Sequence, residues 1–132
     1  MNVPLITPEL VRLDADLGST KAEVITSVAG IIAAAGRADA DGLAHDALDR
    51  EAQSPTGMPG GFAIPHCRSA AVSQPSLGFA RLSPAVDFNG PDGPADLVFM
   101  IAAAEGAGAD HMKLLTQLAR ALVKTEFVEQ LR

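Results

Sequence analysis

A histidine follows an apolar tripeptide and a proline at the end of a glycine-rich loop. Phe62-Ala63-Ile64 is a short candidate strand, and Pro65 leads the chain to His66. Proline fixes its own φ and restricts the residue before it, so the backbone at His66 is held firmly at a strand end. Open α/β sheets place their sites at strand ends. A preoriented imidazole there could act as a nucleophile, and a loop histidine without a chemical role is the alternative interpretation.

Two further side chains could bind an anion beside such a nucleophile. His111 follows a candidate helix N-cap, Asp110, and shares a face with the leucines of that helix. Free N–H groups and the positive end of the helix dipole favour anions and neutral imidazole there. Arg50 precedes the Gly/Pro loop and carries the fork of donors that suits a phosphoryl group. Each also has a purely structural interpretation, as a core-edge histidine and as a solvated last-turn arginine.

The loop over 54–61 offers polar groups close to glycines. Glu51, Ser54 and Thr56 lie in or beside it. Hydroxyls and free backbone N–H groups near glycine can cradle phosphate oxygens. No GxxxxGK[ST] or GxGxxG motif occurs in the sequence, so the loop is not a known nucleotide-binding type.

A metal site is the competing interpretation of the histidines. Cys67 adjoins His66, but adjacent side chains of an extended chain point apart. One cysteine with His66 and His111 also falls short of a structural zinc set. The remaining histidine, His45, lies among aspartates on a candidate helix and is interpreted as a solvated helix residue. We therefore expect no metal and no cofactor.

The composition is that of one globular domain. The chain has 132 residues, of which 48% are hydrophobic and 20% charged, and this excludes disorder as the main state. The net charge of −6 and the absence of Trp and Tyr remove both the basic surface and the stacking platform that nucleic acids need. No signal peptide or apolar membrane span is visible, so a cytoplasmic location is expected.

The elements that must position these residues alternate between helices and apolar strands. Capping residues predict helices over 20–36 and 39–53, and a third helix begins at Asp110. Apolar runs predict strands over 62–64, 77–82 and 97–104, of which the last is buried on both faces. This alternation favours an α/β sandwich with helices on both faces of the sheet. The remaining segments are an edge strand or turn over 5–13, loops over 54–61, 83–95 and 106–109, and a helix over 126–132.

Taken together, these residues resemble a known family. Arg50-Glu51, Ser54 and the run from Thr56 to His66 are similar to the phosphorylation-site signature of fructose/mannitol-type (type 2) enzyme IIA domains. These domains belong to the bacterial phosphoenolpyruvate:sugar phosphotransferase system. The signature combines Arg-Glu, a Thr-Gly loop and Gly-x-Ala-Ile/Val-Pro-His. His111, which follows Asp110 at the start of the leucine-rich helix, matches the family's second histidine. The resemblance covers nearly the whole chain.

The resemblance implies a fold and a set of partners. It implies a single domain over 1–132, built as a three-layer α/β sandwich with a mixed sheet flanked by helices. The phosphoryl group would come from the phosphocarrier protein HPr and pass to a cysteine of a IIB domain. The sugar would then be phosphorylated at a membrane IIC domain. Because family members extend further at the C-terminus, we expect the chain to be truncated or excised from a fused IIA–IIB–IIC protein.

The resemblance also implies roles for the residues. His66 would accept the phosphoryl group, through Nε2 by likeness to the family, without a metal. Arg50 and His111 would stabilise the phosphoryl oxygens. The supporting polar groups would be Thr56, Ser54 and Glu51.

Three other interpretations stay open. The nitrogen-regulatory branch of the same fold keeps the histidine but acts by phosphorylation-dependent binding to other proteins. A binding module without chemistry would leave His66 unphosphorylated and would tolerate replacement of Arg50. A metalloenzyme would bind zinc through His66, Cys67 and His111.

Overall fold

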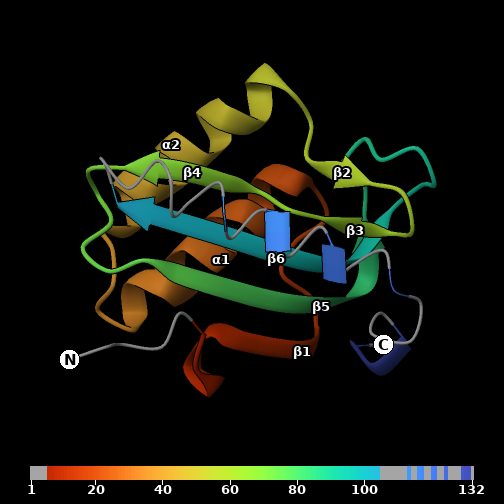
Figure 1. The fold of residues 1–132 in the computed structure, drawn as a ribbon, viewed down its shortest axis with the longest axis horizontal. Coiled ribbons are helices and arrows are strands. Elements are labelled where there is room, and N and C mark those ends of the chain that lie inside the picture. Colours follow the sequence, from red (N-terminus) through yellow and green to blue (C-terminus); the bar gives the residue numbers. More distant parts are fainter. Residues whose placement is uncertain are drawn as a thin grey trace.

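The computed structural model describes residues 6–104 together with 113, 116–117, 120–121, 124 and 129–131 (Figure 1). A 3-10 helix, Pro8–Leu10, leads into strand β1 (Val11–Ala15), and two helices follow, α1 (Lys21–Ala34) and α2 (Ala40–Gln53). The later strands in the described part of the chain are β2 (Gly57–Met58), β3 (Phe62–Ala63), β4 (His66–Ser69), β5 (Ser76–Val86) and β6 (Ala95–Ala104).

The strands form one mixed sheet in the order β1-β5-β6-β3-β2, with β4 also paired to β6. β5 and β6 run antiparallel, whereas β1 is parallel to β5, and both β3 and β4 are parallel to β6. β3 and β4 follow one another along the same side of β6, where Ala63 pairs with Val98 and His66 with Ile101. The expected α/β fold with a mixed sheet is confirmed.

Local signals place α1 and α2 where the sequence predicts them. The Thr20 side chain accepts from the Glu23 N–H over 3.2 Å, and the Asp39 side chain accepts from the Gly42 N–H over 2.9 Å. Each cap satisfies an N–H that the first helical turn leaves without a partner. Within the described residues, no helix is both long and apolar enough to cross a membrane.

The sheet separates two apolar clusters, because alternate residues of a strand point to opposite faces. α1 and α2 cover one face and enclose the larger cluster, which includes Val98 and Met100 of β6. On the other face, Phe79 and Phe99 have ring centroids 5.0 Å apart. Leu131 packs on this second cluster. The described residues 113, 116–117, 120–121 and 129–131 are helical, and the rest of the two predicted C-terminal helices lies outside the described residues.

Strand boundaries differ most from the sequence predictions. β5 continues beyond position 82 into the segment expected to be a turn-rich connection, and Val86 still pairs with Ala95 after an irregularity in the register. The sequence does not reveal this continuation, because residues 83–85 are exposed and include a proline, which is typical of a turn. The edge strand or turn expected over 5–13 corresponds in its later part to β1, an edge strand that starts at Val11 after the 3-10 helix and continues to Ala15. β4 was not predicted, because it is only four residues long and Cys67 is the one apolar residue in it.

Candidate active site

His66 is the first residue of β4, directly after the break that Ile64 and Pro65 make between two strands. Pro65 has no N–H for the ladder, but its carbonyl accepts from the Ile101 N–H over 2.9 Å. The sequence places His66 just beyond a strand, and the structure places it at the start of a second strand in the same line. The central strand β6 therefore fixes the backbone that carries the imidazole.

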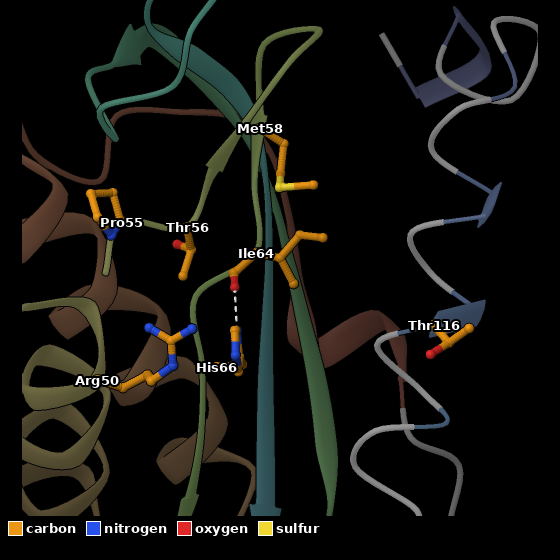
Figure 2. Close-up of a pocket in the computed structure, with 7 residues that line it drawn as sticks. All are labelled: Arg50, Pro55, Thr56, Met58, Ile64, His66 and Thr116. Carbon is orange, nitrogen blue, oxygen red and sulfur yellow. Dashed lines mark hydrogen bonds between the residues drawn. The ribbon is translucent and has the colours of Figure 1, made fainter. Parts of the chain in front are cut away.

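The His66 ring is held by one short hydrogen bond. Nδ1 lies 2.7 Å from the carbonyl oxygen of Ile64 (Figure 2). Because a carbonyl oxygen only accepts, Nδ1 must donate, and neutral His66 then carries its lone pair on Nε2. Burial lowers the pKa of His66 below its ordinary value of 6.5, and the charge of Arg50 lowers it further, while the bond to Ile64 and the charge of Glu51 raise it. The net lowering favours neutral imidazole near neutral pH.

Arg50 stands beside His66 at the C-terminal end of α2. Its Nη1 donates to the carbonyl oxygen of Ser54 over 3.0 Å, which ties the guanidinium to the start of the loop. Figure 2 shows the guanidinium on the His66 side of α2. A guanidinium keeps its charge at all working pH values and offers several donors in a fixed plane. The side chain can therefore stabilise an anion next to the imidazole.

A buried carboxylate anchors the loop after α2. Glu51 is only 3% exposed and accepts twice from Thr56, from the backbone N–H over 2.8 Å and from the hydroxyl over 2.6 Å. The carbonyl of Thr56 in turn accepts from the Ile64 N–H over 3.1 Å. The family resemblance implies that the Thr56 hydroxyl supports the phosphoryl group. In the structure this hydroxyl donates its hydrogen bond to Glu51 instead. Glu51 and Thr56 therefore hold the loop in its conformation.

These residues border a pocket of about 300 Å³. Arg50, Thr56 and His66 line it, as the sequence analysis expects of one site, and Thr116 lies on the other side of His66 from Arg50 in the view of Figure 2. Most of the remaining wall is apolar. The lining residues that sequence reasoning missed are Pro55, Met58, Ile64 and Thr116.

The other predicted site residues lie apart from the pocket or outside the described residues. Ser54 is exposed and does not line the pocket, although its carbonyl orients Arg50. Glu51 is buried and bonded to Thr56, and it is not among the residues that line the pocket. His111 and its expected cap Asp110 fall outside the described residues. His45 is a solvated helix residue with a 74% exposed side chain, as predicted.

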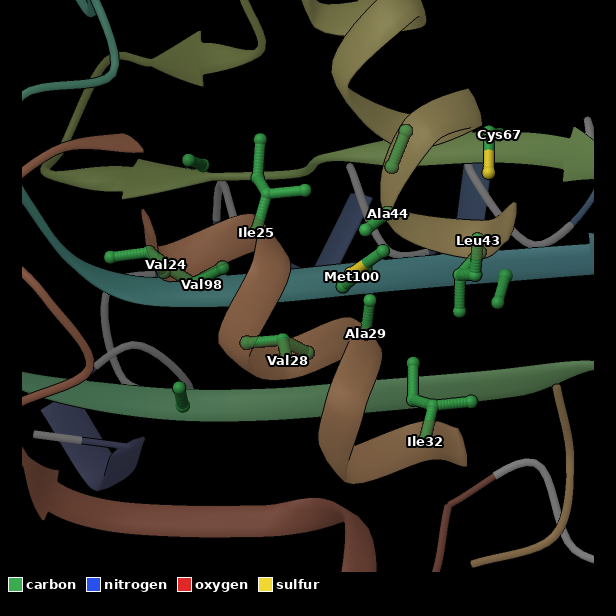
Figure 3. Packing of buried hydrophobic residues seen from close by; sticks show 14 of the residues in the cluster. Val24, Ile25, Val28, Ala29, Ile32, Leu43, Ala44, Cys67, Val98 and Met100 are labelled. Atoms are coloured by element: carbon green, nitrogen blue, oxygen red, sulfur yellow. The ribbon is translucent and has the colours of Figure 1, made fainter. Parts of the chain in front are cut away.

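Cys67 does not share the pocket with its neighbour. It belongs to the core cluster beneath α2 (Figure 3), whereas His66 lines the pocket on the opposite side of β4. Burial raises the pKa of the Cys67 thiol to about 11, so it stays protonated. Among the described residues, no three side chains of the His, Cys, Asp and Glu types gather in a way that could hold a metal ion.

The arrangement suits transfer of an anionic group to imidazole. A neutral ring with a fixed Nδ1 proton directs an electrophile to Nε2. The adjacent guanidinium stabilises the negative charge that develops on the transferred group. The apolar wall of the pocket strengthens this electrostatic interaction.

The sequence matches a protein family over residues 4–132. The family is described as "Phosphoenolpyruvate-dependent sugar phosphotransferase system, EIIA 2". A fructose-specific EIIA component of this system from Haloferax volcanii is 38% identical over 98% of the chain and 86% of that protein. A fructose-specific EIIABC component from Bacillus subtilis is 38% identical over 96% of the chain, which spans only 20% of that relative's length.

Solved structures have the same fold. The nitrogen regulatory protein IIA-Ntr from Neisseria meningitidis superposes with a TM-score of 0.88 at 26% identity, covering 96% of this chain and 87% of that one. A complex of enzyme IIAMTL and phosphorylated enzyme IIBMTL from Escherichia coli gives a TM-score of 0.79 at 24% identity, with 96% and 87% covered.

Proposed function

Because the chain belongs to the EIIA 2 family of the phosphoenolpyruvate-dependent sugar phosphotransferase system, we propose that His66 is its phosphoryl acceptor. The donor is phospho-HPr, and the next acceptor is a cysteine of a IIB domain, which serves uptake of a fructose-like sugar through a membrane IIC domain. The hydrogen bond from His66 Nδ1 to the Ile64 carbonyl supports this assignment most strongly. It leaves Nε2 of the neutral ring as the nucleophile.

The first step forms a bond between Nε2 of His66 and phosphorus while the bond from phosphorus to HPr breaks. The electron pair of the broken bond returns to the donor atom of HPr. The Nδ1 proton stays in its hydrogen bond to the Ile64 carbonyl, so the phosphorylated ring carries one positive charge until the second step. Arg50 stabilises the negative charge that is spread over the phosphoryl oxygens. His111, which lies outside the described residues, is proposed to stabilise these oxygens as well.

In the second step a IIB thiolate attacks phosphorus and the bond to Nε2 breaks, which restores the lone pair on His66. The complex of enzyme IIAMTL with phosphorylated enzyme IIBMTL supports such a partner for this fold. The fructose-specific relatives support a fructose-like sugar.

A regulatory role is the second candidate, and the high structural similarity to IIA-Ntr favours it. The two roles differ in the second step. A transport domain passes its phosphoryl group to a fructose-type IIB domain, whereas a regulatory domain retains it in the presence of IIB. Incubating the phosphorylated chain with IIB and following loss of the label separates them.

The proposal is tested by incubating the chain with phosphoenolpyruvate, enzyme I and HPr, followed by intact-mass spectrometry at alkaline pH. We expect one acid-labile phosphoryl group on the wild-type chain and none on His66→Ala. His45→Ala is the matched control, because His45 is exposed and bonded to Asp46 outside the pocket. Equal labelling of His66→Ala, or no labelling while a known IIA domain is labelled in parallel, would refute the assignment.

A further inference from the structure

A lysine outside the pocket connects to the loop that shapes it. Lys21 is the first residue of α1 and is partly exposed. A cation in the first turn opposes the helix dipole, so its position needs another explanation. Its Nζ lies 3.6 Å from Oε2 of Glu51 and donates to Oδ1 of Asn89 over 2.6 Å. Lys21 thus joins the start of α1 to the end of α2 and to the segment before β6.

Glu51 needs this cation because its carboxylate is almost completely buried. Its two oxygens receive the N–H and the hydroxyl of Thr56, and Lys21 supplies a compensating charge. A buried carboxylate is tolerated when it is both paired and hydrogen-bonded. Removing the lysine would leave Glu51 without this partner, and the loop would have to move to let in water.

The same loop sets the orientation of the imidazole. Thr56 is fixed by Glu51 and accepts from the Ile64 N–H. The Ile64 carbonyl then accepts from Nδ1 of His66. Ile64 therefore connects the loop, through its N–H, to His66, through its carbonyl, and a displacement of the loop would shift the acceptor that selects the His66 tautomer.

We propose that Lys21 is a positioning residue of the site: it compensates the charge of Glu51, which acts through Thr56 and the backbone of Ile64 to keep His66 in its Nδ1–H form. Its consequence for phosphoryl transfer rests on the proposed function. The tautomer itself exists without any phosphoryl donor and can be measured on the isolated chain.

The test is two-dimensional NMR of the ¹⁵N-labelled chain, in which the imidazole nitrogen shifts of His66 report its tautomer above the pKa. The wild-type chain is expected to show the Nδ1–H form as the main species. Lys21→Met is expected to lower the ratio of Nδ1–H to Nε2–H by about tenfold, roughly the contribution of one hydrogen bond. Lys21→Arg restores the charge and is expected to restore the ratio.

Two further variants isolate the cause. Lys124→Met makes the same substitution at an exposed position and is expected to leave the ratio as in the wild-type chain. Thr56→Val removes the hydroxyl bond to Glu51 but keeps the N–H bond, so it is expected to lower the ratio even if Lys21→Met does not fold. A wild-type ratio in folded Lys21→Met, or in Thr56→Val, would overturn the proposal.

The proposed function can fail separately from this inference. If Lys21→Met shifts the tautomer while wild-type chain is not labelled by phospho-HPr, the positioning role stands and the phosphoryl-acceptor role is refuted. If the wild-type chain is labelled and the Lys21→Met tautomer is unchanged, the positioning role is refuted and the acceptor role stands.

Discussion

Gly57 is a position where one added carbon should disturb both the fold and the site. It lies between Thr56 and Met58, which both line the pocket. A Cβ built on Gly57 would come within 2.5 Å of the Phe88 carbonyl oxygen, 2.6 Å of the Gly90 nitrogen and 2.8 Å of the Gly90 Cα. All three are backbone atoms, so no side chain can rotate away to make room.

The size of the effect follows from these distances. Non-bonded heavy atoms approach to about 3.5–4.0 Å, so each contact is about 1 Å too short and one of the two segments must move. Such overpacking costs about 1–3 kcal/mol. We expect Gly57→Ala to lower the free energy of unfolding by that amount and to slow phosphorylation of His66, because the shift carries Thr56 and its bond to Ile64 with it.

The matched control is the same substitution at Gly30, within α1, where a Cβ would meet nothing within 4 Å. Because glycine weakens a helix interior, Gly30→Ala should stabilise the chain by about 0.5–1 kcal/mol. Urea unfolding of both variants and of the wild-type chain measures the two effects. A Gly57→Ala variant as stable as the wild-type chain, or a Gly30→Ala variant that loses more stability, would refute the packing argument.

The remaining predictions concern the core, the pH dependence that His66 causes and the buried thiol. Met100 is completely buried beneath α1 and α2 (Figure 3), so Met100→Ala should lose about 2–5 kcal/mol in urea unfolding, and a loss below about 1 kcal/mol would contradict its place in the core. Because the pKa of His66 is lowered, the phosphorylation rate should fall with decreasing pH only below pH 6.5. Arg50→Gln removes a charge that lowers this pKa, so the fall should begin at a higher pH. An unchanged pH dependence would contradict the electrostatic role of Arg50. By linkage, the stability that His66 contributes is present above pH 6.5 and is lost as the pH falls through its lower folded-state pKa. The Cys67 thiol, with its pKa raised to about 11, should alkylate slowly in the native chain and rapidly in urea, whereas rapid native alkylation would place it at the surface.

Local chemistry explains what the sequence could predict. The caps of α1 and α2 depend on neighbours three residues away, Thr20 with Glu23 and Asp39 with Gly42. The long apolar run of β6 needs no partner to be recognised. The pocket residues Arg50, Thr56 and His66 were found because the motif keeps them within a short stretch of chain.

Non-local pairing explains what the sequence could not predict. β4 pairs along its whole length with β6, whereas its own four residues are too few and too polar to predict a strand. The acceptor that sets the His66 tautomer is a backbone carbonyl, which no residue type reveals. Lys21 meets Glu51 and Asn89 across long sequence separations, and only the packing of three segments brings these charges and dipoles together.

The most direct test of the account is the position of the phosphoryl group on the chain. The ¹⁵N-labelled chain is phosphorylated with phosphoenolpyruvate, enzyme I and HPr, and its imidazole nitrogens are observed by NMR at alkaline pH. The account predicts a phosphorus–nitrogen bond at Nε2 of His66, because the Nδ1 bond to Ile64 places the ring lone pair on that nitrogen. A phosphoryl group on Nδ1 of His66, or on any other residue, would contradict it.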